Sequence, residues 1–270
     1  MDDKNWKSIK ARQKSTWEAG DFGQIAKYNE ASVEEFVARL PLQPGMGVLD
    51  VACGTGRLSF IAARRGCHMA GVDLAANLVA QARERAAAER VEIEFKEGDA
   101  EALPYPDQSF DAVVSRFGAM FAPRPERVAA EMYRVTKPGG FAAMANWTPQ
   151  GFIGRMFELF KAYLPPPPAE IPSTMLWGDE AVVRDRLKAF AQVRLTRRMA
   201  GQRFPFSPSE TVDFFRRFYG PTLRAFEALG PDQQQALHRD LVELQTKHNC
   251  SGSSDTTETQ AEYLEVIAIR

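Results

Sequence analysis

Short apolar segments alternate with longer amphipathic segments between about residues 46 and 146. This alternation is typical of βαβ units, in which a helix connects one strand to the next parallel strand. We therefore predict a parallel sheet in this part of the chain. Its strands are expected at five apolar segments, namely 46–51, 67–73, 91–95, 110–115 and 141–145.

The segments between these strands carry recognisable helix ends. We predict helices over Arg57–Arg65, Ala75–Arg90 and Pro125–Thr136, the first followed by a glycine and the last beginning with a proline. Ahead of the first strand, Ser32-Val-Glu-Glu35 has the spacing of a capping box and predicts a helix that starts there.

After Trp147 the pattern becomes mostly helical. Gly151–Leu164 predicts a helix that is apolar on nearly all sides and therefore needs cover from several neighbours. Further helices are expected over 180–190 and 207–249, and a strand over 193–197. The polar segment 251–260 is interpreted as a mobile loop, and the alternation over 263–269 predicts a closing strand.

Charge and composition restrict the possible partners. Lys and Arg number 34 against 35 for Asp and Glu, a formal net charge of −1, so no strong field draws the protein to nucleic acid or to an anionic membrane. Three unevenly spaced cysteines and no CxxC favour neither a disulfide framework nor a zinc site, and fit a reducing cytoplasm. No apolar run of membrane-spanning or signal-peptide type is present. We therefore expect a cytoplasmic protein.

The segment Val48–Leu58 predicts a strand that passes through small residues into a helix. Small residues at 52, 54 and 56 allow the backbone to approach a ligand closely, and the N-terminus of the following helix offers unpaired amides to a negative group. Gly54-x-Gly56 alone is a weak signal. In its context it favours a site for a nucleotide-like ligand.

Polar residues end the next strands of the predicted sheet. Asp73 ends the second strand, where a carboxylate can accept hydrogen bonds from both hydroxyls of a ribose. Asp99 follows the third strand and Ser115 ends the fourth, so all three are expected to converge beyond the carboxyl ends of the strands. A nicotinamide cofactor is the less favoured ligand, because Gly56-Arg-Leu-Ser59 lacks the third small residue of GxGxxG.

Five segments together resemble the motifs of class I S-adenosylmethionine-dependent methyltransferases, closest to the ubiquinone/menaquinone methyltransferase-like small-molecule group. They are Val48–Leu58, Gly71–Leu74, Glu97–Pro104, Phe110–Gly118 and Lys137–Gly140. The resemblance implies an α/β fold with a doubly wound, mostly parallel seven-stranded sheet, a Rossmann-like methyltransferase fold closed by the antiparallel strand at 263–269. A mostly helical cap is expected over it. The resemblance also implies S-adenosyl-L-methionine as the cofactor.

The resemblance assigns a role to each matching residue. A loop of Asp50, Ala52, Gly54, Thr55 and Gly56 would lie under the methionine part of the cofactor. Asp73 would hold the ribose, Leu74 would flank the adenine, and Asp99 with the Ala100 amide would bind the adenine edge. Ser115 would lie near the methionyl amine. Ala52 departs from the family pattern, which usually has a glycine there.

The predicted organisation follows from these assignments. Residues 1–44 form a helical segment over the cofactor site, 45–150 form the core, 151–178 a helical lid, 179–200 a core helix and strand, 201–250 a helical cap insertion, and 251–270 a loop and closing strand. Aromatic residues are frequent in 151–178 and 201–250, which favours a small, apolar or aromatic acceptor beneath them.

Methyl transfer from a sulfonium needs an aligned acceptor and exclusion of water more than a dedicated base. The candidates for a base are Tyr28 and His248, each of which packing also explains. No metal site is predicted, and neither a membrane nor nucleic acid is the expected partner. The alternatives are a subunit or sensor that binds the cofactor without turnover and, less favoured, an RNA methyltransferase.

Overall fold

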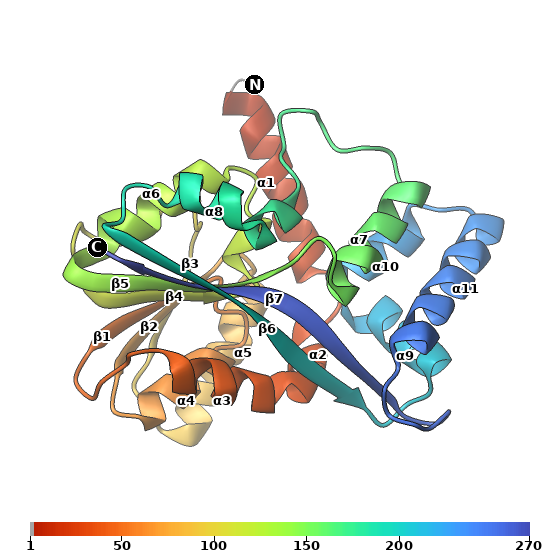
Figure 1. The fold of residues 1–270 in the computed structure, drawn as a ribbon, viewed down its shortest axis with the longest axis horizontal. Helices are drawn as coiled ribbons and strands as arrows, with labels where there is room; N and C mark the ends of the chain where they lie inside the picture. Colours follow the sequence, from red (N-terminus) through yellow and green to blue (C-terminus); the bar gives the residue numbers. More distant parts are fainter. Residues whose placement is uncertain (1–2) are drawn as a thin grey trace.

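The computed structural model describes residues 3–270, and its centre is a seven-stranded sheet with strand order β3-β2-β1-β4-β5-β7-β6 (Figure 1). The strands run over the following residues: β1 Gly47–Val51, β2 His68–Asp73, β3 Glu94–Glu97, β4 Phe110–Arg116, β5 Thr136–Trp147, β6 Gln192–Phe204 and β7 Thr257–Ile269. The first five are parallel to one another, and β7 pairs antiparallel with both β5 and β6. The predicted α/β sheet is confirmed.

Helices cover both faces of the sheet, as expected of a doubly wound fold. Figure 1 shows α3 (Glu30–Arg39), α4 (Arg57–Arg64) and α5 (Ala76–Glu89) on one face, with α6 (Pro125–Val135) and α8 (Glu180–Arg186) on the other. The strand order reverses between β1 and β4, because β2 and β3 lie to one side of β1 while β4 and β5 lie to the other. The carboxyl ends of these two strands mark the place where a ligand is expected.

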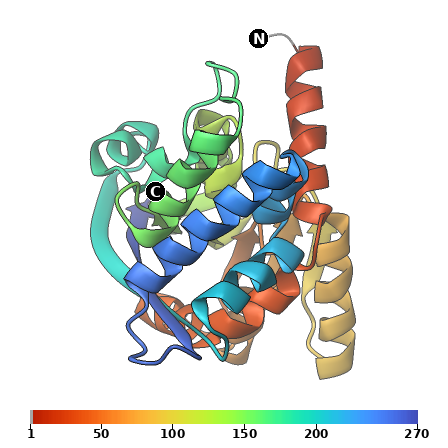
Figure 2. The ribbon, with the colours of Figure 1, turned by 90° about the vertical axis from the view of Figure 1, so that its right-hand side faces the viewer.

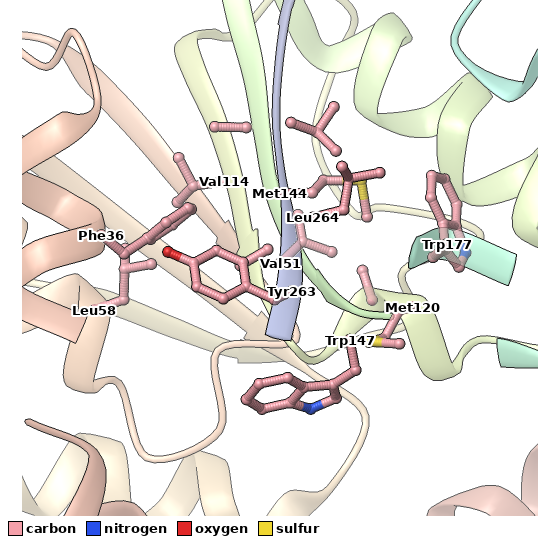
Figure 3. Packing of buried hydrophobic residues seen from close by; sticks show 14 of the residues in the cluster. Phe36, Val51, Leu58, Val114, Met120, Met144, Trp147, Trp177, Tyr263 and Leu264 are labelled. Carbon is pink, nitrogen blue, oxygen red and sulfur yellow. The ribbon is translucent and has the colours of Figure 1, made fainter. Parts of the chain in front are cut away.

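The core follows from the apolar strands that were predicted. Val51 and Val114 on neighbouring strands are fully buried, as are Phe36 of α3 and Leu264 of β7. Figure 3 shows Phe36 and Trp177 on opposite sides of the β7 ribbon, so the sheet is packed on both faces. A sheet buried on both faces requires nearly continuous apolar strands, which is the pattern of the sequence.

The remaining helices form a cap at the carboxyl ends of the central strands. They are α1 (Asp3–Glu18), α2 (Phe22–Ala26), α7 (Phe152–Tyr163), α9 (Pro208–Phe218), α10 (Gly220–Glu227) and α11 (Pro231–His248). Figure 2 shows α11 crossing in front of the other cap helices, with α1 standing beside them. Helix α1 contacts α10 and α5, so it joins the cap to the core. None of the helices in residues 3–270 is long and apolar enough to cross a membrane.

Three short helices of the 3-10 type complete the chain: η1 (Lys27–Asn29), η2 (Ala119–Phe121) and η3 (Thr174–Gly178). In the chain, η1 lies between α2 and α3, η2 between β4 and α6, and η3 between α7 and α8.

The helix expected to start at Ser32 begins earlier. Helix α3 begins at Glu30 with Asn29 as its N-cap residue, and the Ser32 hydroxyl donates to the Asn29 carbonyl at 3.0 Å. The capping-box prediction was wrong here, because the backbone is already helical at Ser32. A Ser207–Glu210 capping box does form at the start of α9.

Other differences concern strand lengths. Strand β3 begins at Glu94 instead of residue 91, and α8 ends at Arg186 instead of continuing to residue 190. Strands β6 and β7 are much longer than predicted, and they pair with each other from Gln192↔Ile269 to Phe204↔Thr257. Residues 257–260 of the segment interpreted as a loop therefore lie in β7, while residues 251–256 form no helix or strand, and residues 201–204 belong to β6 instead of a helical insertion.

Candidate cofactor and acceptor site

A cavity opens at the carboxyl ends of β1, β2 and β4 and is covered by the cap. Its floor contains most of the residues predicted from the strand ends: Asp50, Ala52, Gly54, Thr55, Asp73, Leu74, Asp99 and Ala100. Cap helices contribute another part of the wall: Gln13 and Trp17 of α1, Phe22, Ile25 and Ala26 of α2, Ile153 and Met156 of α7, and Phe215 of α9. The structure thus brings together segments from the whole length of the chain.

The loop after β1 has the close backbone geometry that small residues allow. Ala52 and Gly54 have φ angles of 56° and 55°, in the left-handed region that favours glycine. A side chain at Gly54 would point into open space, since the nearest atom to its added Cβ is a carbon of the Phe22 ring at 3.9 Å. The loop therefore leaves room for a ligand beside Gly54.

Gly56 has a different role. It precedes α4 at φ 76°, and a Cβ there would come within 2.6 Å of the Phe95 ring. It is absent from the residues that line the cavity. The second glycine of the pair therefore permits close packing of α4 against β3.

Two buried carboxyl groups lie in the floor. Asp73 accepts hydrogen bonds from the Gly54 amide at 2.7 Å and the Ala75 amide at 2.9 Å, and burial raises its pKa. Each carboxylate oxygen keeps a second lone pair for a ligand. Asp50 is 2% exposed and accepts from the Ser59 hydroxyl at 2.7 Å; burial raises its pKa to about 7, and the charge of Asp73 adds to this rise.

Asp99 stands at the opposite end of the floor, under α1. Its carboxylate accepts from the Glu101 amide at 2.9 Å and from Lys10, whose ammonium group also lies 2.6 Å from Glu101. The neighbouring Ala100 amide, by contrast, has no hydrogen-bond partner among residues 3–270. An unpaired backbone donor at the cavity wall is available to a ligand.

Ser115 does not line the cavity. Its hydroxyl donates to the Val51 carbonyl at 2.7 Å and accepts from the Ala119 amide at 3.0 Å. These bonds connect β1 to the turn after β4, so the structure gives Ser115 a role in fixing the wall. Its predicted contact with the methionyl amine stays a prediction without support from this geometry.

The two candidates for a base lie outside the cavity wall. Tyr28 packs among Phe204, Phe206 and Phe214, with ring centroids 4.9–5.9 Å away. The Nδ1 atom of His248 lies 2.9 Å from the Leu244 carbonyl, within the last turn of α11. Both positions agree with packing roles.

The part of the cavity beyond β4 is lined by aromatic side chains. Phe117 stacks on Trp147 with ring centroids 3.5 Å apart, and Phe215 and Tyr219 come from the cap. Of the aromatic residues predicted in 151–178 and 201–250, only Phe215 and Tyr219 are among the lining residues of the described chain. Trp177, for example, is buried in the core, because an apolar surface also has to be filled beneath β5.

Sequence analysis did not single out several lining residues. Arg116 and Phe117 follow Ser115 directly, while Asn29 and Gln202 come from distant segments and Trp17 from α1. The sequence offered one indication of this part of the wall, namely the arginine Arg116 at the end of the mostly apolar strand β4. No periodicity could place Asn29 beside Gln202, whose amide nitrogen donates to the Asn29 side-chain oxygen at 2.6 Å.

Comparison with known proteins agrees with this geometry. Residues 49–144 match the family model of the methyltransferase domain. Rv1403c of Mycobacterium tuberculosis is 37% identical over 241 residues, covering 87% of this chain and 88% of the relative. The chain belongs to the same family as Rv1403c, an uncharacterized protein, and its methyltransferase domain makes it an S-adenosylmethionine-dependent methyltransferase. S-adenosylmethionine is accordingly the cofactor, and the enzyme class predicted from the motifs is confirmed.

Other relatives of this methyltransferase share less of its length or sequence. Malonyl-(acyl-carrier protein) O-methyltransferase of Pectobacterium atrosepticum is 34% identical over 54% of each chain. The structure of YcgJ protein from Bacillus has a TM-score of 0.61 at 19% identity, covering 89% of this chain and 98% of YcgJ. A phosphoethanolamine N-methyltransferase of Haemonchus contortus, solved with S-adenosylhomocysteine, has a TM-score of 0.56 at 19% identity and covers 89% of this chain and 52% of its own. These structures share the fold.

Proposed function

We propose that this methyltransferase acts on a small, largely apolar or aromatic acceptor. The observation that carries the proposal is the continuous cavity, which extends from the polar floor at β1 and β2 to a wall of aromatic rings at Phe117, Trp147 and Tyr219. An apolar pocket with few polar groups suits small hydrophobic ligands. A demethylmenaquinone methyltransferase of Thermus thermophilus is 34% identical over 52% of this chain, which supports the quinone-methyltransferase-like group.

The floor of the cavity fits the cofactor. We assign the ribose to Asp73, whose oxygens have lone pairs free, and the adenine to Leu74 and the unpaired Ala100 amide. The methionine part is assigned to the loop at Asp50–Thr55, where a Cβ would fill the open space at Gly54. Gly56 and Ser115 support this loop from behind and fix its position.

When bound, S-adenosylmethionine supplies a methyl group on a positively charged sulfur. The contribution of the protein is to hold an acceptor in line with that group and to exclude water. Trp17 of α1 and Phe22 of α2 close the cavity from the side of the cap, with ring centroids 6.1 Å apart. Burial raises the pKa of Tyr219, so its phenol stays protonated at neutral pH. No proton-accepting role is assigned to it.

Gly54→Ala tests the proposed cofactor position. The added methyl group would enter the space assigned to the cofactor, so we expect binding of S-adenosylmethionine to weaken at least about tenfold. Gly139→Ala is a matched control, because Gly139 also has a positive φ and open space around it but does not line the cavity. Both variants should lose about 1 kcal/mol of stability from the left-handed alanine.

Isothermal titration of both variants with S-adenosylmethionine measures the effect, and release of S-adenosylhomocysteine across a library of phenols, quinols, thiols and amines measures turnover. Equal affinities for the two variants would place the cofactor elsewhere. Turnover of strongly polar acceptors alone would contradict the proposed acceptor class.

A further inference from the structure

Arg116, the last residue of β4, lines the cavity without an ionic partner. One nitrogen of its guanidinium group donates to the Ser32 hydroxyl at 2.6 Å. No carboxylate oxygen in the described residues lies within 4 Å of the group, although the phenol of Tyr263, the guanidinium of Arg39 and the carboxylate of Glu35 act on it from farther away. Burial lowers the pKa of Arg116 to about 10, so the group remains charged at neutral pH.

The other arginine of the cavity wall is neutralised. Arg57 donates to the Glu30 carboxylate at 3.1 Å. The contrast matters because a charge removed from water is costly unless it is paired. The cavity therefore contains one uncompensated positive charge, and it is located at Arg116.

Arg116 lies on the side of the site assigned to the acceptor. Strands β4 and β5 lie across β1 from β2 and β3, whose ends carry the residues assigned to the adenosine. The guanidinium lies 4.4 Å from the centre of the Phe117 ring, which stacks on Trp147. A planar cation next to aromatic rings can bind the anionic end of a ligand while the rings contact its apolar body.

Polar atoms without partners are found in the same wall. Gln202 is 6% exposed, and its side-chain oxygen has no hydrogen-bond partner in the described structure. The side-chain nitrogen of Asn29 also lacks a partner, since only the oxygen of this amide is used, by Gln202. The Asn29 nitrogen can donate to an anionic ligand, whereas the Gln202 oxygen, an acceptor, needs a donor such as a hydroxyl group of the ligand.

Resting on the proposed function, we propose that the acceptor carries a carboxylate and that Arg116 binds it. The acceptor is then an aromatic or apolar carboxylic acid, with its anionic end at Arg116 and the Asn29 side-chain nitrogen and its body against Phe117. Asp50 and Asp73 line the same cavity, so a singly charged carboxylate is favoured over a doubly charged phosphate, which these carboxyl groups would repel more strongly. Charge-assisted bonds between a guanidinium and a carboxylate are the strong ones in proteins.

Matched acids and amides test the proposal. Protein saturated with S-adenosylhomocysteine is titrated calorimetrically with 4-hydroxyphenylacetate and 4-hydroxyphenylacetamide, and with indole-3-acetate and its amide. We expect the wild-type protein to bind the acids at least about tenfold more tightly than the amides. In Arg116→Gln the preference should fall below about twofold, while Arg194→Gln should leave it unchanged, because Arg194 is exposed on β6 and does not line the cavity.

Affinity for S-adenosylhomocysteine shows whether Arg116 binds the acceptor or the carboxylate of the cofactor. We expect this affinity to change by less than about twofold in Arg116→Gln. A large loss with the acid preference retained would show that Arg116 binds the carboxylate of the cofactor, and it would overturn the proposal. Acids that bind no better than amides, or no binding by either, would also overturn it.

If Arg116→Gln fails to fold, Arg116→Lys gives the answer. Lysine keeps the charge but loses the forked donor geometry, so the preference for acids should decrease several-fold with cofactor affinity intact. An unchanged preference in this variant would overturn the proposal. Wild-type protein that does not bind S-adenosylmethionine at all would instead contradict the proposed function, whereas turnover restricted to neutral acceptors would contradict only the role of Arg116.

Discussion

Asp50 is a carboxyl group at the centre of the cavity floor, and its titration couples the site to stability. Its pKa is about 7 in the folded protein because of burial, against 3.8 for the exposed group. The unfolded chain therefore releases this proton at lower pH than the folded one. Between about pH 4 and pH 7 the unfolded state binds fewer protons at this position, so the contribution of Asp50 to stability falls as the pH rises and is lowest above about pH 7.

Asp50→Asn removes this dependence. Asparagine keeps an oxygen to accept from Ser59, so below about pH 4 the variant and the wild type should differ little. Above about pH 7 the wild type, without ligand, should be less stable than the variant by an amount on the order of 4 kcal/mol. Urea unfolding at several pH values measures the difference, with the exposed Asp255→Asn as control. A difference that does not grow between pH 4 and pH 7 would contradict the buried, protonated state.

Backbone strain also concentrates at single residues of the site. Ala52 and Phe117 are non-glycine residues with φ of 56° and 60°. Gly118 faces Ala52 so closely that a Cβ there would come within 2.5 Å of the Ala52 Cβ. The alanine that departs from the family pattern is thus accommodated by a glycine on the neighbouring turn.

The sequence predicted the residues of the floor better than those of the wall. Asp50, Gly54 and Asp73 follow strands within one βαβ pattern, and such local order is visible in a sequence. Arg116 lies in one of the matching motifs, but its role could not be predicted, because only the structure shows that no carboxylate in the described residues pairs with it. Gln202 depends on a pairing of segments 173 residues apart, which no local pattern reports.

At the scale of elements, the predictions were confirmed where a strand or helix had a regular pattern of apolar residues along its whole length. The parallel strands and α4, α5 and α6 were predicted within a few residues. Strands β6 and β7 were underestimated, because their alternation is interrupted by Gly201 in β6 and by the polar residues 257–260 in β7, which pair with each other in the structure. The start of α3 was predicted wrongly because serine is a typical N-cap residue, whereas Ser32 lies inside the helix, after Glu30.

Helix α1 is attached to the molecule by aromatic contacts near its two ends and, between them, by ion pairs of Lys10 and Lys14. Near its end, Trp17 lines the cavity and meets the rings of Phe22, Phe121 and Tyr219 at 5.1–6.1 Å. Near its start, Trp6 lies 5.1 Å below the guanidinium of Arg124. The aromatic cluster of Trp17 connects α1 to α2, to η2 and to the junction of α9 and α10.

Trp17→Ala should therefore loosen α1. We expect a loss of about 1–3 kcal/mol in the free energy of unfolding, because a half-buried aromatic ring loses its contacts. Trp6→Ala is the matched control and should cost less than about 1 kcal/mol. Chemical denaturation measures both losses, and limited trypsin digestion should cut after Lys14 sooner in the first variant. Equal losses for the two variants would show that the aromatic cluster does not hold α1.

At the scale of the whole molecule, the cavity connects the two halves of the structure. The sheet supplies its floor, and α1, α2, α7 and α9 supply much of its cover. Helices α8 and α11 contribute no lining residue among those described. A ligand in this cavity therefore contacts some elements of the cap and leaves others untouched.

This asymmetry predicts where cofactor binding slows hydrogen exchange. Amides that exchange by global unfolding gain the same protection everywhere, whereas amides that exchange by local opening gain it only where that opening excludes the ligand. With S-adenosylhomocysteine at 100 times its dissociation constant, we expect amides of α2 and the 52–57 loop to slow by about 100-fold. Locally opening amides at the ends of α8 and α11 should be unaffected. Hydrogen exchange measured by mass spectrometry with and without the ligand tests this prediction. Equal protection of α8 and α2 would mean that α2 does not open to admit the cofactor.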